Sequence, residues 1–427
     1  MLIKKPRIAI LTLRNTYNYG GVLSSLKVVY EFTSIYFEPT VFFLGFGSDV
    51  GMHLKKGKFT STAKSLTYFG MNCIEVGARW GFWEPGHYWF TRDTWKAYLK
   101  DFDYIFVVSG TCIAAHPAQI LNKKYVMWIA TSYNEDRAER EKKLRGLRAF
   151  INVCAKGIMN TLEATILRQA SYIWAYSAYA EKDFLAKLGD KTEAIVRCGF
   201  PIDTSIYQQF DSKKEEAIIA VGRFSDPRKN IGMLLRVFQL LYERNHKLVL
   251  YIVGMKPDAE TLFPFINYSS YKNIIFTGQV SSDDLHLFYQ RSQLMLITSY
   301  QEGLGIVGLE AMHYGLPVVS TDCGGTADYV INGTTGYLVP INNDMEMAHH
   351  AHAILLNHYH AQALSFNAKQ LIEKQFSKPT IYARFKEGLT VAYPELAQHF
   401  EIVDKAKQDL SLPQESRPFN ALRETRL

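Results

Sequence analysis

Short apolar runs alternate with amphipathic helical stretches along the whole 427-residue chain. This alternation predicts parallel sheets, because each buried parallel strand needs a helix to cross back to the start of the next one. The expected strands are 7–13, 40–44, 104–108, 125–129 and 172–175 in the first half, and 217–221, 248–253, 274–276, 294–297 and 317–320 in the second. The predicted fold class is therefore α/β.

The length of the chain and a short segment near its middle indicate two domains. The run Cys198-Gly-Phe-Pro-Ile-Asp203 places a glycine and a proline between the two series of strands. We expect an N-terminal domain at 1–198, with an irregular aromatic-rich insertion at 46–100, and a C-terminal domain at 204–385. A helix returning to the first domain is expected at 386–399, followed by a charged, poorly ordered tail at 400–427. The insertion either packs on the first domain or forms a binding surface.

A glycine-rich turn separates two carboxylates, Glu302 and Glu310. It follows the apolar run 294–297 and precedes a helix that should carry Glu310 about two turns in. The N–H groups of a helix start suit a phosphate, and glycines let the backbone approach it. Carboxylates beside a phosphate would repel it, so they are better suited to accept hydrogen bonds from sugar hydroxyls. A nucleotide sugar meets both demands.

A second motif supports the same ligand. Gly222 and Arg223 follow the strand 217–221, and Lys229 stands just before the next helix. The two cations can converge on one diphosphate, where they would stabilise the charge that grows as a sugar departs. A solvated basic turn is the alternative for this segment taken alone.

Together these motifs resemble those of family 4 glycosyltransferases, which have the two-domain GT-B fold. The resemblance covers about 205–340 and includes Gly315-Leu-Pro-Val-Val and Asn332-Gly-Thr-Thr-Gly-Tyr-Leu-Val. It implies sugar transfer from a nucleotide-activated donor with retention of configuration and without a metal or other cofactor. By position, Arg223 and Lys229 would hold the diphosphate, Glu310 the ribose and Glu302 the donor sugar. The backbone at Gly222 and the amides of Gly303, Leu304 and Gly305 would complete the donor site.

The first domain matches the family less closely. Gly21 belongs to a glycine turn after the first strand, where relatives usually have a loop beside the diphosphate. Many relatives also place a histidine just after the strand that matches 125–129, and this chain has none there. His116 is the nearest substitute as a catalytic group, although a lone histidine is more often structural. Thr131, Ser132 and Glu135 offer polar contacts instead.

Other features narrow the possible partners. The five cysteines lie far apart, which indicates reduced thiols and a cytoplasmic protein. A net charge of +7 without a nucleic-acid signature does not call for DNA or RNA. Histidines cluster at 349, 350, 352, 358 and 360, but no cysteine or carboxylate pattern completes a metal site.

A basic amphipathic stretch lies in the first domain. Lys142, Lys143, Arg145 and Arg148 alternate with apolar residues at helical spacing. Such a helix either lies peripherally on the inner face of an anionic membrane or is an ordinary surface helix whose apolar side faces inward.

The expected function is a retaining transfer of sugar from a nucleotide-diphosphate donor to a saccharide or lipid-linked acceptor, in cell-envelope polysaccharide or glycolipid assembly. A nucleotide-sugar epimerase or a sugar phosphorylase of the same architecture is an alternative enzyme. A carbohydrate-binding protein that has lost turnover is the alternative outside enzymes.

Overall fold

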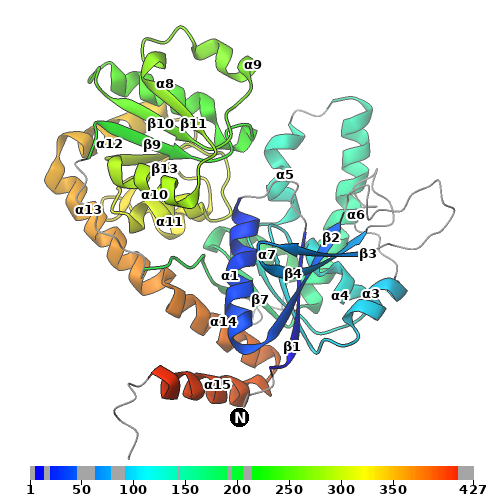
Figure 1. Cartoon of the computed structure of the whole chain (residues 1–427). Helices are drawn as coiled ribbons and strands as arrows, with labels where there is room; N and C mark the ends of the chain where they lie inside the picture. Colours follow the sequence, from blue (N-terminus) through cyan, green and yellow to red (C-terminus); the bar gives the residue numbers. More distant parts are fainter. Residues whose placement is uncertain are drawn as a thin grey trace, which may run out of the picture.

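The computed structural model describes residues 5–13, 20–45, 63–77, 92–142, 145–189, 195–204 and 214–411. They form two α/β domains, each built on a sheet with helices against it (Figure 1). The predicted fold class is confirmed.

The first domain contains an eight-stranded sheet in the order β3-β4-β2-β1-β5-β6-β7-β8. All neighbouring pairs are parallel except β3 with β4. The strands are β1 (Arg7–Leu13), β2 (Glu38–Gly45), β3 (Ala63–Tyr68), β4 (Met71–Gly77), β5 (Tyr104–Ser109), β6 (Val126–Ile129), β7 (Tyr172–Ala175) and β8 (Ile195–Arg197). The helices are α1 (Gly21–Tyr36), α3 (Arg92–Leu99), α4 (His116–Ile120), α5 (Tyr133–Glu141), α6 (Leu147–Gln169) and α7 (Ala178–Leu188).

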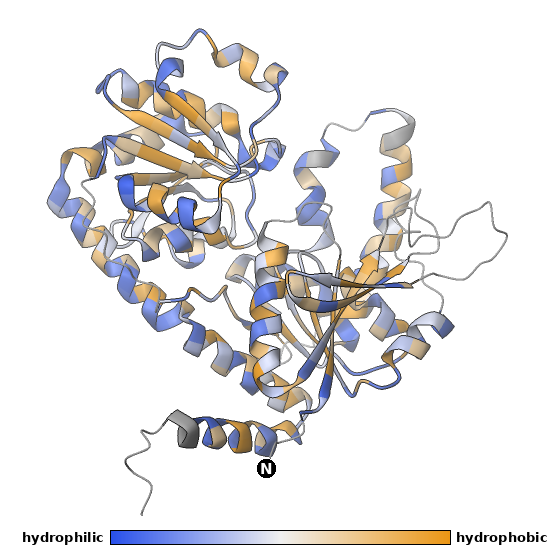
Figure 2. Cartoon of the chain, viewed as in Figure 1, coloured by the Kyte–Doolittle hydropathy of each residue, from blue (hydrophilic) through white to orange (hydrophobic). Residues whose placement is uncertain are grey.

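The second domain contains a six-stranded parallel sheet in the order β11-β10-β9-β12-β13-β14. Its strands are largely hydrophobic, as Figure 2 shows, and the central strands β9, β12 and β13 are almost wholly buried. They are β9 (Ala217–Val221), β10 (Val249–Val253), β11 (Ile274–Gly278), β12 (Leu294–Ile297), β13 (Val318–Thr321) and β14 (Gly336–Val339). The helices are α8 (Ile231–Tyr242), α9 (Ala259–Leu262), α10 (Ser282–Arg291), α11 (Ile306–His313), α12 (Asp344–Leu356) and α13 (His358–Leu371).

Each sheet has a point where the order of strands reverses. In the first sheet β1 lies between β2 and β5, and in the second β9 lies between β10 and β12. The loops that leave two such neighbouring strands diverge to opposite faces of the sheet, which opens a crevice at their carboxyl ends. These two crevices position the candidate site.

Two C-terminal helices, α14 (Lys378–Ala392) and α15 (Leu396–Ser411), lead back to the first domain (Figure 1). Phe385 of α14 packs edge-on against Phe106, Trp128 and Trp174 of the first sheet. Gly388 lies so close to the sheet that a Cβ there would be 2.4 Å from Trp174 Cζ2. The return crossing therefore fills part of the first domain's core.

Two boundary predictions are wrong in the described residues. Within 46–100, the segments 63–77 and 92–99 are regular structure, because β4 continues the parallel sheet beyond β2 and β3 pairs with β4. The aromatic residues 80–90 of that insertion lie outside the described residues. In the tail, 400–411 continues helix α15, which is held to α1 where the Tyr36 hydroxyl donates to Asp404 Oδ1 at 2.8 Å.

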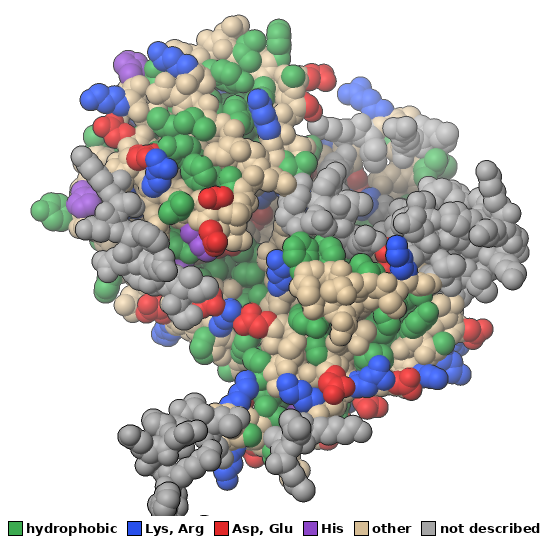
Figure 3. Space-filling model, in the orientation of Figure 1, with side chains coloured by type: hydrophobic (Ala, Val, Ile, Leu, Met, Phe, Trp, Pro, Cys, Tyr) green, Lys and Arg blue, Asp and Glu red, His purple; other side chains and the backbone are tan. Residues whose placement is uncertain are grey.

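The surface shows no large area of one charge in the view of Figure 3, where basic and acidic side chains interleave over both domains. In the described part of the chain, no helix combines the length and apolarity needed to cross a bilayer.

Candidate active site

A cavity of about 640 Å³ lies between the two domains. Its first-domain wall includes Gly21 after β1 and Ser109 at the end of β5. Its second-domain wall includes Arg223 after β9 and Glu302 after β12. The cavity is thus built from the carboxyl ends of the strands that flank both points of reversal, where ligands of such sheets bind.

The glycine turn after β12 folds tightly against the first domain. Gly305 caps α11 with a positive φ of 78°, which a side chain would disfavour. A Cβ on Gly303 would be only 2.7 Å from the carbonyl oxygen of Ala130 in the first domain. Since α11 begins at Ile306, Glu310 lies just over one turn into the helix, and the prediction of two turns is wrong.

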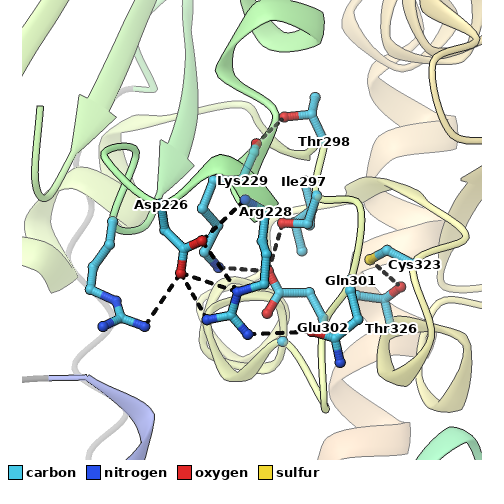
Figure 4. A network of polar contacts seen from close by, with 12 residues as sticks. Asp226, Arg228, Lys229, Ile297, Thr298, Gln301, Glu302, Cys323 and Thr326 are labelled. Carbon is cyan, nitrogen blue, oxygen red and sulfur yellow. Dashed lines mark hydrogen bonds and ion pairs between the residues drawn. The ribbon is translucent and has the colours of Figure 1, made fainter. Parts of the chain in front are cut away.

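Glu302 is held by two donors from neighbouring loops (Figure 4). Lys229 Nζ donates to Glu302 Oε1 at 2.6 Å, and Ser299 Oγ donates to the same oxygen at 2.6 Å. Burial by itself raises the pKa of Glu302, but the charge and hydrogen bond of Lys229, with smaller help from Ser299 and Arg228, outweigh it and lower that pKa. Glu302 is therefore ionised and paired with the lysine predicted to bind diphosphate.

The two arginines of the loop after β9 differ in their surroundings. Arg223 lines the cavity with 36% of its side chain exposed, and its Nη2 lies 3.8 Å from Asp226 Oδ2. Arg228 is largely buried, contacts Asp226 Oδ2 at 2.8 Å and reaches across to Asp136 Oδ1 in the first domain at 3.1 Å. Arg223 has the accessibility that a ligand requires. Arg228, which is not among the site residues predicted from sequence, joins the domains.

Glu310 faces the cavity from α11 and has a hydroxyl partner. Tyr289 of α10, fully buried, donates to Glu310 Oε2 at 3.0 Å. Burial raises the pKa of Glu310 to about 7, and the hydrogen bond from Tyr289 lowers it only in part. Tyr289 was missed because it lies 21 positions before Glu310 in the sequence, and only the packing of α10 on α11 reveals the pair.

The first-domain wall consists largely of small and hydroxyl-bearing residues. The lining residues from this domain are Gly20, Gly21, Val22, Ser24, Ser25, Ser109, Gly110, Ala130, Thr131, Asp136 and Tyr176. Ser109 is 2% exposed, and its hydroxyl has no hydrogen-bond partner in the structure. An unpaired buried hydroxyl at a cavity wall is suited to a polar ligand.

The proposed substitutes for the family histidine do not all reach this wall. His116 is not among the lining residues, because α4 turns it toward Gln119, whose Oε1 lies 3.1 Å from His116 Nδ1. Glu135 accepts a short hydrogen bond from Tyr179 and does not line the cavity either. Thr131 does line it and receives a 3.4 Å hydrogen bond from Gln301 Nε2. The prediction for His116 is therefore not supported by its position.

Two further contacts fasten the domains beside the glycine turn. Ser177 Oγ donates to the Gly303 carbonyl at 2.6 Å, and the Ala178 N–H donates to Asp328 Oδ2 at 2.9 Å. Burial raises the pKa of Asp328, which the Ala178 N–H partly offsets. The start of α7 thereby fixes the turn that carries Glu302.

The clustered histidines engage in local contacts. His350 stacks on Tyr337 at 4.1 Å between ring centroids, and His360 Nε2 lies 3.1 Å from the Tyr337 hydroxyl. Among the residues that the structure describes, no group of three or more His, Cys, Asp or Glu side chains is arranged to hold a metal ion.

Known structures match this architecture over most of the chain. Anabaena HepE, solved in complex with UDP-glucose, superposes with a TM-score of 0.68 at 17% identity, covering 90% of this chain and 99% of HepE. WaaG, a glycosyltransferase involved in lipopolysaccharide biosynthesis, superposes with a TM-score of 0.65 at 15% identity over 90% of this chain and 99% of WaaG. The fold is GT-B.

Sequence comparisons reach mainly the second GT-B domain. Residues 202–371 match the family model described as Glycosyl transferases group 1. The N-acetyl-alpha-D-glucosaminyl L-malate synthase of Bacillus anthracis is 26% identical over 176 residues, which is 41% of this chain and 45% of the relative. The lipopolysaccharide 1,2-N-acetylglucosaminetransferase of Salmonella typhimurium is 25% identical over 249 residues, 54% of this chain and 65% of the relative. The chain thus spans about half the length of these relatives.

Proposed function

We propose that this protein transfers a sugar from a nucleotide-diphosphate donor to a saccharide or lipid-linked acceptor, with retention of configuration and without a metal. The observation that carries the proposal is the shared cavity, which is lined by Arg223, Lys229, Glu302 and Glu310 from four different positions of the second domain. Cations for a diphosphate and carboxylates for hydroxyls face one space large enough for such a ligand.

The diphosphate would lie against the loop after β9 and the start of α11. Arg223 is accessible there, and Gly222 approaches Lys229 closely enough that a Cβ would be 3.2 Å from its Cε. In the transfer, the bond between the anomeric carbon and the phosphate oxygen breaks and a bond to the acceptor oxygen forms. Fixed cations stabilise the charge that gathers on the departing phosphate more than they stabilise the bound donor.

Donor binding would exchange the partners of Lys229. A diphosphate competes with Glu302 for the ammonium group, which lies 2.6 Å from the carboxylate. Once the lysine turns to the phosphate, Glu302 keeps Ser299 as a donor and gains capacity to accept from a sugar hydroxyl. The exchange would couple recognition of the diphosphate to recognition of the sugar.

The acceptor would enter along the first-domain wall. His116 is not among the groups lining this wall. A departing diphosphate would itself be a base close to the acceptor hydroxyl. We therefore propose that the acceptor proton passes to the departing diphosphate as the new bond forms. Retention follows if the acceptor attacks from the face that the phosphate leaves.

The names of relatives suggest the setting. Proteins involved in lipopolysaccharide and capsular polysaccharide biosynthesis are among them. We propose a role in assembling cell-envelope polysaccharide or glycolipid. The solved HepE complexes make UDP and UDP-glucose the first ligands to test.

The decisive experiment is nucleotide-sugar turnover by wild type and by two cation variants. Arg223→Ala and Lys229→Ala should each lower the rate of donor consumption by about 10²–10³-fold, because each removes a preorganised charge from the leaving group. Arg244→Ala and Lys247→Ala, exposed cations of the same domain, serve as matched controls and should keep wild-type rates. Equal rates in all five proteins would refute the assignment.

Product analysis separates the other candidates. Transfer to a saccharide or lipid without added inorganic phosphate supports the proposal. A requirement for phosphate would identify a phosphorylase, and an epimerised donor would identify an epimerase. Donor binding without any product in the presence of varied acceptors would favour a binding protein. Activity that survives chelation of divalent cations tests independence from metal.

A further inference from the structure

Helix α6 exposes an apolar stripe to solvent. Phe150 and Val153 are each 67% exposed, Ile158 is 50% exposed and Ile151 is 44% exposed. Cys154 is also exposed. At 100° per residue these side chains fall on one side of the helix, together with Gly157 and Thr161.

The opposite side of α6 supplies the packing that holds the helix. Ala155, Met159, Ile166 and Leu167 are buried there. Helix α6 is thus apolar on both its inner and its outer side. Of the two alternatives for this stretch, an apolar side that faces inward does not describe Phe150 and Ile151, because the inward positions are filled by this second set. From 149 to 162 the sequence contains one charged residue, Lys156.

Basic residues gather at the N-terminal end of this stripe. Residues 139–156 contain six basic and two acidic residues. Lys142 and Arg145 are exposed in the connection between α5 and α6. Both acidic residues already have partners, since Glu139 pairs with Lys142 at 2.6 Å and Glu141 with Lys156 at 2.9 Å. In the sequence, the basic residues of this stretch exceed the acidic ones by four.

The basic end lies near the mouth of the cavity. Helix α5 carries Asp136, which lines the cavity, and ends at Glu141. Lys142 Nζ lies 5.8 Å from the centroid of the Tyr300 ring, two positions before Glu302 in the chain. In Figure 1, α5 and α6 stand side by side on the same part of the first domain.

We propose that the exposed stripe of α6 docks on an anionic lipid surface. Apolar side chains on one side of a helix enter the boundary between headgroups and acyl chains, and adjacent cations are attracted to anionic headgroups. A solvent-facing stripe with this neighbouring charge fits that surface, whereas an ordinary exposed helix face would be polar. The docking would bring the cavity mouth to a lipid-linked acceptor, a consequence that rests on the proposed function, although the docking itself does not.

Co-sedimentation of the full chain with vesicles tests the proposal. We expect binding to vesicles that contain phosphatidylglycerol and much weaker binding to vesicles of phosphatidylcholine alone. The double variant Phe150→Ser with Val153→Ser should bind the anionic vesicles at least about tenfold more weakly, because two large apolar groups no longer leave water. Lys142→Gln with Arg145→Gln should also weaken binding, and added salt should remove that difference.

Matched controls keep the result interpretable. Tyr359→Ser with Phe366→Ser changes two apolar residues of α13 that are 84% and 64% exposed, and vesicle binding should not change. All variants should bind nucleotide diphosphate as the wild type does, so that lost docking is separated from a failed donor site. Absence of wild-type binding to anionic vesicles, or equal binding by the α6 and α13 variants, would overturn the proposal. So would self-association in solution that the α6 substitutions abolish, since the stripe would then belong to a second copy.

Discussion

The two walls of the cavity are built from related sheets but differ in chemistry. The second-domain wall contributes Arg223, Arg228, Lys229, Glu302 and Glu310, whereas the described first-domain lining contributes one charged residue, Asp136. That carboxylate is already paired with Arg228 of the opposite wall at 3.1 Å. A charged ligand group therefore finds its partners in the second domain, and the first domain offers hydroxyls and backbone. Under the proposed function, this difference would make the second-domain wall the one that holds the donor and leave the first-domain wall to acceptors of varied structure.

The largest effect is expected from a substitution that forces the two walls of the cavity apart. Gly303→Ala would place a Cβ 2.7 Å from the Ala130 carbonyl, so the glycine turn and the first domain must separate. A misplacement of about 1 Å at a reacting centre can cost about 10²-fold in rate. We expect that loss in turnover of nucleotide sugar. Gly157→Ala is the control, because nothing lies within 4 Å of its Cβ position, and its turnover should match wild type.

The ionisation of Glu310 tests whether the second-domain wall binds the nucleotide sugar. Its pKa is raised to about 7, so the carboxylate becomes protonated as pH falls through that value and accepts hydrogen bonds less well. Below pH 7, the affinity for the nucleotide sugar should therefore fall by at most about tenfold for each pH unit. The measurement is calorimetry with the intact nucleotide sugar, whose diphosphate diester does not titrate in this range.

Glu310→Gln is the corresponding control. This variant should bind more weakly near pH 8 and lose the pH dependence. An unchanged pH dependence would show that another group titrates. Tyr289→Phe should shift the dependence to higher pH, because the hydroxyl that stabilises the Glu310 carboxylate is removed.

The smallest expected effect concerns the first wall. Ser109→Ala removes a buried hydroxyl that has no hydrogen-bond partner, so thermal unfolding should be unchanged or the free energy of unfolding higher by up to about 1 kcal/mol. If the acceptor contacts this hydroxyl, the KM for the acceptor should rise a few-fold in the variant while donor affinity stays constant.

Ser177→Ala should have the opposite effect on the free energy of unfolding. Its hydroxyl caps α7 and donates to Gly303, so its loss should destabilise the protein by about 1 kcal/mol.

The sequence predicted the regular parts of this fold well because they are long or strongly apolar. The strands 7–13, 172–175, 217–221 and 294–297 coincide with β1, β7, β9 and β12. It missed β8 and β14, which have three and four residues and depend on a neighbouring strand for their conformation. It also missed β3 and β4, in which polar residues interrupt the apolar ones and leave no continuous apolar run.

In the candidate site, too, the residues with a local sequence signal could be predicted and those that depend on distant contacts could not. The second-domain residues could be chosen because they lie in two short segments that end strands and begin helices. The sequence gives no comparable signal for Arg228 as a tie between domains, since its partner Asp136 lies 92 positions earlier. His116 was chosen by proximity in sequence to a strand end, but the direction of its side chain is set by α4 and Gln119.

The packing of α14 has a consequence for how the chain is made. Phe385 completes an aromatic cluster with Phe106, Trp128 and Trp174, residues that precede it by more than 200 positions. While a ribosome is still translating the second half, the first sheet has emerged with these rings uncovered. Synthesis must continue past Phe385 before the first sheet can bury them, so the nascent chain stays open to chaperones and to aggregation while the roughly 200 residues between Trp174 and Phe385 are made.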